Sequence, residues 1–419
     1  MKTDVEIAVA DAHRREWAYV LAATVRVAGD IDLAEECVQD AYARALARWP
    51  IDGIPINKGA WLTTVARRRA IDLRRRSDTL GRLLPMLSDD ESESVPEESD
   101  TAPLSDDRLR LIFTCCHPAL SDESQIALTL RLVCGLTTNE VSRALLVSES
   151  TMAARITRAK KKIAAAHIPY SVPSTQELPA RIEAVLTVVH LLFTSGHTAA
   201  AGDQLVRRDL VERALELARM LRVLLPEHRG VAGLLALILL TDSRRETRVG
   251  PDGQLILLSD QERSKWDHVE IAEGVALVRV ALRPRPPDRF ALMAAVAAVH
   301  AEAPTWDATD WTEIVGLYDV LSDIWPSPIV ALNRAVAVGF AHGPQAGLDE
   351  IEVLATDPTL SSYSYLASSR AEFLHRLGRN EEATLAFEEA LAFCDNTVER
   401  NFLMLRIAKM ERLGRGAPG

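Results

Sequence analysis

Small polar and basic side chains recur on one face of a predicted helix near the middle of the chain. Four of them are spaced by four, three and four residues, with a serine just before the first. In order these residues are Ser150, Thr151, Arg155, Arg158 and Lys162. Such spacing keeps side chains on one helical face. Short polar groups at a helix start can approach base edges in a DNA major groove, and arginines further along can reach bases or phosphates.

The elements around this face have the pattern of a helix-turn-helix. Thr137 and Glu140 form a capping box that starts the first helix, and Ser148 can cap the second after a short turn. A separate stripe would pack inward: Met152, Ile156, Ala159 and Ile163. Six bases and two acids between residues 137 and 163 favour DNA binding. The alternative is a surface helical hairpin with a solvated basic face.

A second basic helix is predicted over residues 59–76, in the stretch WLTTVARRRAIDLRRR. Two arginine triplets lie a heptad apart on nearly the same faces. They include Arg67, Arg68, Arg74 and Arg75. Such a helix can follow a phosphate backbone. The alternative is a solvated helix end, because cations are also favourable at a helix C-terminus.

The preceding helix, predicted from Asp30 to Trp49 and ended by Pro50, has the opposite charge. Asp32, Glu36 and Asp40 fall at i, i+4 and i+8 and form an acidic stripe. That stripe is suited to a basic protein partner. Plain solvation is the alternative for such a charge row.

Composition divides the chain and predicts an all-α protein. Alanine, leucine, arginine and glutamate dominate, and only 5% of the residues are aromatic. An acidic, proline-containing stretch with almost no apolar residues (88–103) cannot bury a core, which predicts a flexible linker. We therefore expect one helical domain over residues 1–76, a linker over 77–104, a second helical domain over 105–168 and a third over 176–419.

The third block contains a weak internal repeat. Its clearest unit runs from Ala367 to Phe393, with small residues and Phe387 at tetratricopeptide-like spacings, and Ala346 in a fainter copy matches Ala383. These patterns predict a helical-repeat domain, with an ordinary pair of helical hairpins as the alternative.

Other chemistries have little support in the sequence. Cys115, Cys116 and His117 lack the spacing of a metal site, and His197 is a lone histidine in a Gly-flanked stretch. Because no catalytic or nucleotide-binding motif occurs, we expect neither an enzyme nor a cofactor. Five cysteines without a CxxC pair fit a reducing compartment. No signal peptide is visible and the longest apolar run is short, so we expect a cytoplasmic protein that does not contact membranes.

The order of these segments resembles the extracytoplasmic-function (ECF) sigma factors of RNA polymerase. The segments DLAEECVQDAYARALARWP and GAWLTTVARRRAIDLRRR are similar to region 2 of that family, and LTTNEVSRALLVSESTMAARITRAKKKI is similar to region 4. The string DDRLRLIFTCCHPALSDESQIAL and the long helical extension resemble the subgroup with a C-terminal tetratricopeptide-like domain. Where that subgroup tends to carry an FNEGY-like motif, this chain has FTSGHTAA at residues 193–200.

The resemblance implies a function and a role for each face. The chain would direct core RNA polymerase, through its β′ and β subunits, to promoter DNA. Asp32, Glu36 and Asp40 would face the β′ clamp helices. Residues 50–58 would hold the unstacked −10 strand beside Arg67, Arg68, Arg74 and Arg75, and the helix with Ser150, Thr151, Arg155, Arg158 and Lys162 would read the −35 element. The third block would regulate activity and bind a protein or ligand of unknown identity. The alternative function is a DNA-binding helical-repeat protein that does not serve polymerase.

Overall fold

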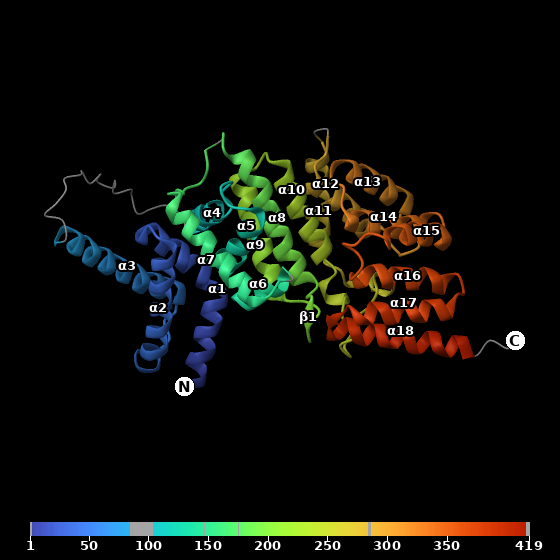
Figure 1. Cartoon of the computed structure of the whole chain (residues 1–419), viewed down its shortest axis with the longest axis horizontal. Coiled ribbons are helices and arrows are strands. Elements are labelled where there is room, and N and C mark those ends of the chain that lie inside the picture. Colours follow the sequence, from blue (N-terminus) through green and yellow to red (C-terminus); the bar gives the residue numbers. More distant parts are fainter. Residues whose placement is uncertain (1, 84–103, 146, 175, 284–285, 416–419) are drawn as a thin grey trace. The chain divides into compact units, whose positions relative to one another are not determined.

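A computed structural model describes residues 2–83, 104–145, 147–174, 176–283 and 286–415. Helices make up most of these residues, which confirms the all-α prediction. The only strands among them are two short segments, β1 (Ala201–Gly202) and β2 (Asp395–Asn396), which pair in parallel. The chain forms two compact units, residues 1–188 and 189–419 (Figure 1). Each unit is described by itself.

Three long helices begin the first unit. They are α1 (Lys2–Ala28), α2 (Ile31–Asp52) and α3 (Lys58–Leu83). Gly29, at a φ of 72°, ends α1, and the Asp30 carboxylate caps α2 by accepting from the Leu33 amide at 2.8 Å. The apolar faces of the three helices pack together. Residues that are fully buried there include Leu21, Ala34, Val38, Leu62 and Ala66.

Two helix ends differ from the sequence prediction. Pro50 does not end α2: the helix continues to Asp52, and the amide of Gly53, at a φ of 88°, closes it by donating to the Trp49 carbonyl. A proline near the end of a helix removes only one amide donor, and the following turn still forms. The boundary expected at residue 76 lies inside α3. Most of the predicted linker, residues 84–103, lies outside the described residues.

The rest of the first unit contains shorter elements that build the predicted helix-turn-helix. They are α4 (Leu104–Cys115), α5 (Asp122–Leu128), the π-helix η1 (Thr129–Val133), α6 (Thr138–Ala144) and α7 (Glu149–Ala165). Helix α1 packs against both α4 and η1, so the two helical groups expected from the sequence form one compact unit. The Tyr170 hydroxyl links them, because it lies 2.8 Å from the carbonyls of both Ala22 and Asp107 and can share its one proton between them.

Helix α8 (Leu178–His197) contains the boundary between the two units. Its first turns belong to the first unit: Arg181 is buried and donates to the Phe113 carbonyl at 3.4 Å. The expected start of the third block at residue 176 therefore precedes the contact boundary at residue 188.

The second unit is a series of packed helices. They are α9 (Arg208–Leu224), α10 (Arg229–Asp242), α11 (His268–Leu282), α12 (Arg289–Glu302), α13 (Trp311–Ile324), α14 (Pro328–Ala341), α15 (Pro344–Leu354), α16 (Ser364–Arg376), α17 (Asn380–Ala392) and α18 (Thr397–Arg415). Short 3-10 turns occur at η2 (Arg245–Thr247), η3 (Leu258–Asp260) and η4 (Arg263–Lys265). Helix α10 is buried along almost its whole length.

The predicted repeat unit folds as the helical hairpin α16–α17. Gly378 adopts a φ of 77° in its turn, and Ala371, Ala383 and Phe387 are buried between the helices. In the preceding hairpin, α14–α15, a Cβ on Gly347 would lie 2.6 Å from the Gly339 Cα. Small residues thus allow close helix packing in both hairpins, as the spacing predicted.

Candidate nucleic-acid and protein interfaces

Helix α7 has two distinct faces. Met152, Ile156, Ala159 and Ile163 are buried, whereas Ser150, Thr151, Arg158 and Lys162 are exposed and Arg155 is partly exposed. The helix begins where the sequence indicates, because the Ser148 hydroxyl accepts from the Thr151 amide at 3.2 Å. The capping box of α6 also forms: the Thr137 amide donates to Glu140 at 2.7 Å and the Glu140 amide to Thr137 at 3.2 Å.

A cavity of about 330 Å³ lies beside the basic face of α7. Arg155, Arg158 and Lys162 line it from α7, and Ser121 and Ser124 line it from the start of α5. The three cations supply positive charge. The Ser121 hydroxyl donates to that of Ser124 at 3.1 Å, which leaves the Ser124 hydroxyl as a donor. Such a setting can receive a phosphate group of a nucleic-acid backbone.

The arginines of α3 are mostly exposed. Arg68, Arg74 and Arg75 are exposed and Arg67 is partly exposed. Arg74 donates to the carbonyl of Val27 at 2.8 Å, which fixes it against the end of α1. Their shared positive charge can attract a phosphate backbone.

The end of α2 and the turn between α2 and α3 present apolar side chains that the sequence analysis did not single out. The side chains of Ile51, Ile54 and Ile56 are 77%, 41% and 107% exposed. Asn57 ends the turn by accepting from the Ala60 amide at 2.9 Å, which starts α3. Removing an exposed isoleucine side chain from water is favourable in free energy. These side chains are therefore suited to contact an apolar ligand surface such as an unstacked base.

The acidic stripe of α2 is only partly free. Asp32 accepts from Lys160 at 3.0 Å and Asp40 pairs with Arg69 at 3.0 Å. Glu36 is exposed and makes no ion pair with any residue that the structure describes. Of the three acids, Glu36 is therefore the one most available to an outside partner.

A charged cluster that the sequence reading missed joins α2 to the helix-turn-helix. Glu35 is buried and contacts both Lys160 and Arg131, the latter at 3.4 Å. Burial opposes the charged form of Lys160, but the carboxylates of Glu35 and Asp32 outweigh it and raise the pKa of that ammonium. No periodic pattern marks this cluster, because Lys160 lies 125 residues from Glu35 in the chain.

The surroundings of Cys116, His117 and His197 are those of residues with a structural role. Burial raises the pKa of Cys116 to about 12, and its sulfur lies 3.5 Å from the Thr129 hydroxyl. Burial also lowers the pKa of His117, whose Nδ1 accepts from the Ala119 amide at 3.1 Å. His197 is buried against the Phe193 ring. Within the part of the chain that the structure describes, no three such side chains are grouped as metal ligands.

None of the described helices has an apolar stretch long enough to cross a bilayer.

Family models match three consecutive parts of the chain. Sigma-70 region 2 matches residues 12–79, sigma-70 region 4 matches residues 110–163, and a family of unknown function (DUF6596) matches residues 181–282. The first match covers the C-terminal part of α1, all of α2 and most of α3, and the second covers the helix-turn-helix. The third spans α8 to α11.

Two curated relatives align with the chain. An uncharacterised protein of Rhizobium meliloti, R00370, is 41% identical over 391 residues, which is 92% of each chain. The probable ECF RNA polymerase sigma factor SigI of Mycobacterium tuberculosis is 28% identical over 172 residues, 40% of this chain and 58% of that protein. The likeness to R00370 thus covers both units.

Proposed function

Because the chain belongs to the sigma-70 family, as the region 2 and region 4 models and the match to SigI indicate, we propose that it is a sigma factor. It directs core RNA polymerase to specific promoters and assists initiation. The observation that carries this proposal is helix α7, which has a buried stripe on one side and the five predicted DNA-reading residues on the other.

Helix α7 reads the −35 element. Ser150 and Thr151 at its start are short enough to approach base edges, and Arg155, Arg158 and Lys162 reach bases or phosphates further along. The cavity beside these three cations supports a phosphate contact that would set the register of the helix in the groove.

The turn between α2 and α3 takes part in −10 melting. The exposed side chains of Ile54 and Ile56 offer an apolar surface to flipped bases, while Arg67, Arg68, Arg74 and Arg75 hold the strand by its phosphates. Capture of unstacked bases is favourable only after the duplex opens, so it shifts the equilibrium toward the melted state.

The acidic face of α2 binds core polymerase. Asp32, Glu36 and Asp40 are proposed to face the β′ clamp helices, and region 4 is proposed to contact the β subunit. Of the acids, Glu36 is supported most directly, because Asp32 and Asp40 have partners within the first unit. The protein would act in the cytoplasm with polymerase.

The second unit regulates these activities. Its close-packed hairpins support a tetratricopeptide-like domain. Stacked hairpins of that kind build extended binding surfaces. We propose that a protein or a ligand bound there changes the activity of the first unit.

Transcription with purified core polymerase tests the proposal. The full chain, added to core, should give transcripts from promoters that core alone does not use. The double variant Arg155→Ala, Arg158→Ala should lower transcription from promoters with a −35 element about tenfold or more. The control Arg279→Ala, Arg412→Ala removes the same charge from exposed positions in the second unit and should leave transcription unchanged.

Each outcome has a definite meaning. DNA binding without a core-dependent transcript on any promoter would replace the proposal with a DNA-binding protein that does not serve polymerase. A chain truncated after residue 198 tests regulation, because a cut near residue 170 would also remove Arg181 from the core of the first unit. If circular dichroism shows that this fragment folds and its activity equals that of the full chain, the regulatory role is wrong.

A further inference from the structure

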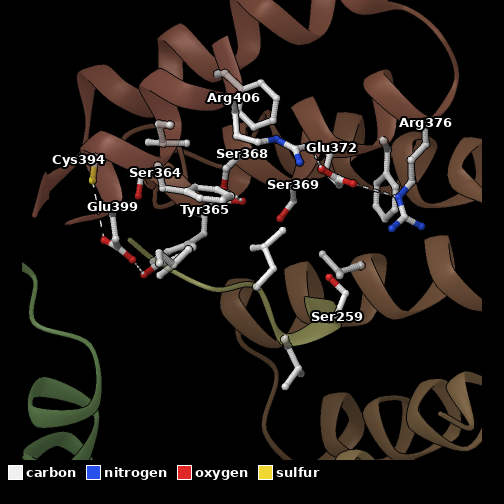
Figure 2. Close-up of a pocket in the computed structure, with 18 of the residues that line it drawn as sticks. Ser259, Ser364, Tyr365, Ser368, Ser369, Glu372, Arg376, Cys394, Glu399 and Arg406 are labelled. Carbon is white, nitrogen blue, oxygen red and sulfur yellow. Dashed lines mark hydrogen bonds and ion pairs between the residues drawn. The ribbon is translucent and has the colours of Figure 1, made fainter. Parts of the chain in front are cut away.

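The second unit contains a cavity of about 300 Å³ that is lined mainly by apolar atoms. Helices α14, α16 and α18 and residues 255–259 surround it (Figure 2). Large apolar side chains make its walls, among them Trp306, Phe340, Phe373 and Phe402. This volume is within the range of small-molecule sites, which are apolar with a few well-placed polar groups.

One side of the cavity carries an excess of positive charge. Glu372 accepts from Arg376 at 3.1 Å and also contacts Arg406, so two guanidiniums share one carboxylate (Figure 2). The Nε atom of Arg406 is buried and has no hydrogen-bond partner among the described residues. A buried donor without an acceptor costs free energy that a bound acceptor would recover.

The serines along α16 leave space in the cavity for a ligand and provide a hydroxyl donor to it. Ser368 and Ser369 line the cavity where larger side chains would fill it. Ser368 donates to the Tyr365 carbonyl at 3.3 Å, whereas the Ser369 hydroxyl makes no hydrogen bond within the described part of the chain. Ser369 can therefore donate to a ligand.

The aromatic walls are not a cation site. Arg376 lies 4.3 Å from the Phe340 ring centre and Arg406 lies 5.3 Å from that of Phe387, so guanidiniums already occupy these two ring faces. A cationic ligand would be repelled by both. At the other side of the cavity, Glu399 accepts from Tyr365, and burial beside that carboxylate raises the pKa of the phenol (Figure 2). An anionic head group is thus favoured at the arginine side and disfavoured at the Glu399 side.

We propose that this cavity binds a medium-chain monocarboxylic acid. Its carboxylate accepts from Arg406 and Arg376, the hydroxyl of Ser369 lies within the same site, and its apolar chain lies against the aromatic walls. A carboxylate matches the guanidinium donors in shape and charge. This site is separate from the promoter and polymerase faces, and its test needs neither.

Isothermal titration calorimetry on the full chain tests the site, with decanoate, decan-1-ol and decylamine as probes below their aggregation concentrations. Decanoate should bind most tightly and decylamine most weakly. Arg406→Gln should weaken decanoate binding about tenfold or more, because it removes a charge-assisted bond, and should change decanol binding far less. Arg412→Gln, an exposed arginine of the same helix, is the matched control. Ser369→Leu should fill part of the cavity and weaken the binding of both decanoate and decan-1-ol.

Thermal melts show which variants are folded. The proposal fails if decanol binds as tightly as decanoate, if a folded Arg406→Gln binds decanoate normally, or if a folded Ser369→Leu does so. It also fails if decanoate does not bind while a peptide with an apolar C-terminal residue and a free carboxylate does, since the occupant would then be a protein. None of these results would bear on promoter recognition, which is measured separately.

Discussion

The ammonium of Lys160 on helix α7 lies 3.0 Å from the Asp32 carboxylate on helix α2, and it also contacts the buried Glu35. These are the two helices to which we assign promoter reading and polymerase binding. In this structure, Lys160 of helix α7 forms ion pairs with Asp32 and Glu35 of helix α2. Contact with polymerase through Asp32 would therefore compete with this ion pair.

Replacing Lys160 should destabilise the first unit. Lys160→Gln leaves the Glu35 carboxylate buried, with Arg131 as its remaining ion-pair partner among the described residues, so we expect the free energy of unfolding to fall by about 2 kcal/mol. Urea unfolding followed by circular dichroism measures this. Lys161→Gln removes the same charge from an exposed neighbour and should have little effect. Equal losses in the two variants would show that the ion pair contributes nothing.

The contribution of Lys160 should depend on pH in a defined direction. Its pKa in the folded protein is raised above the ordinary 10.5, so the ammonium favours folding at all pH values below 10.5. That stability is lost as the pH rises through the raised pKa, because the folded state then loses its proton too. The difference in unfolding free energy between the natural chain and Lys160→Gln should be constant from about pH 7 to 10 and shrink above that range. A difference that grows at high pH would contradict the ion pair.

Glu36 should contribute to polymerase binding without affecting the fold. Glu36 is exposed and makes no ion pair among the described residues, so Glu36→Lys reverses a charge that an outside partner can contact without breaking an ion pair of the fold. We expect affinity for core polymerase, measured by fluorescence anisotropy, to fall about tenfold. Glu212→Lys makes the same change on α9 and serves as the control. Unchanged affinity in Glu36→Lys would remove this face from the interface.

The exposed isoleucines should matter for strand opening alone. Ile54→Ser with Ile56→Ser removes the apolar surface offered to flipped bases, so permanganate reactivity of the −10 region should fall about tenfold. Affinity for an isolated −35 duplex should stay the same. Val223→Ser, at a similarly exposed site in the second unit, is the control. Normal strand opening in the double variant would assign the turn another role.

Alanine substitutions at two glycines of the second unit should change its stability in opposite directions. A Cβ at Gly347 would meet the Gly339 backbone at 2.6 Å, so Gly347→Ala should destabilise the unit by about 1–3 kcal/mol. Gly316 is helical and exposed with no neighbouring atom in the way, so Gly316→Ala should stabilise it by about 0.5–1 kcal/mol. Thermal unfolding of the two variants checks both signs. A stable Gly347→Ala would show that α14 and α15 can move apart.

Local patterns in the sequence predicted much of this structure. The stripe through Met152 and Ile156, the capping box at Thr137 and the close helix packing at Ala383 depend on neighbours in the chain, and all three form. The expected end of α2 at Pro50 was wrong, because the preference of Gly53 for a positive φ decides where that helix closes.

Contacts between distant segments could not be predicted in this way. The pairing of Lys160 with Glu35 and the cavity beside Arg406 depend on how helices pack. Neither produces a periodic pattern in the sequence. The packing of α4 and η1 onto α1, which joins two expected domains into one unit, has the same origin.

The buried cysteines give the protein an internal chemical reporter of local opening. Cys37, Cys115, Cys116 and Cys134 lie in the first unit and Cys394 in the second, and all five are free thiols shielded from solvent. A thiol reacts only as an exposed thiolate, so the rate of alkylation at each position follows how often its surroundings open. Mass spectrometry of labelled peptides would therefore time the opening of each unit separately in the intact chain, with no probe introduced.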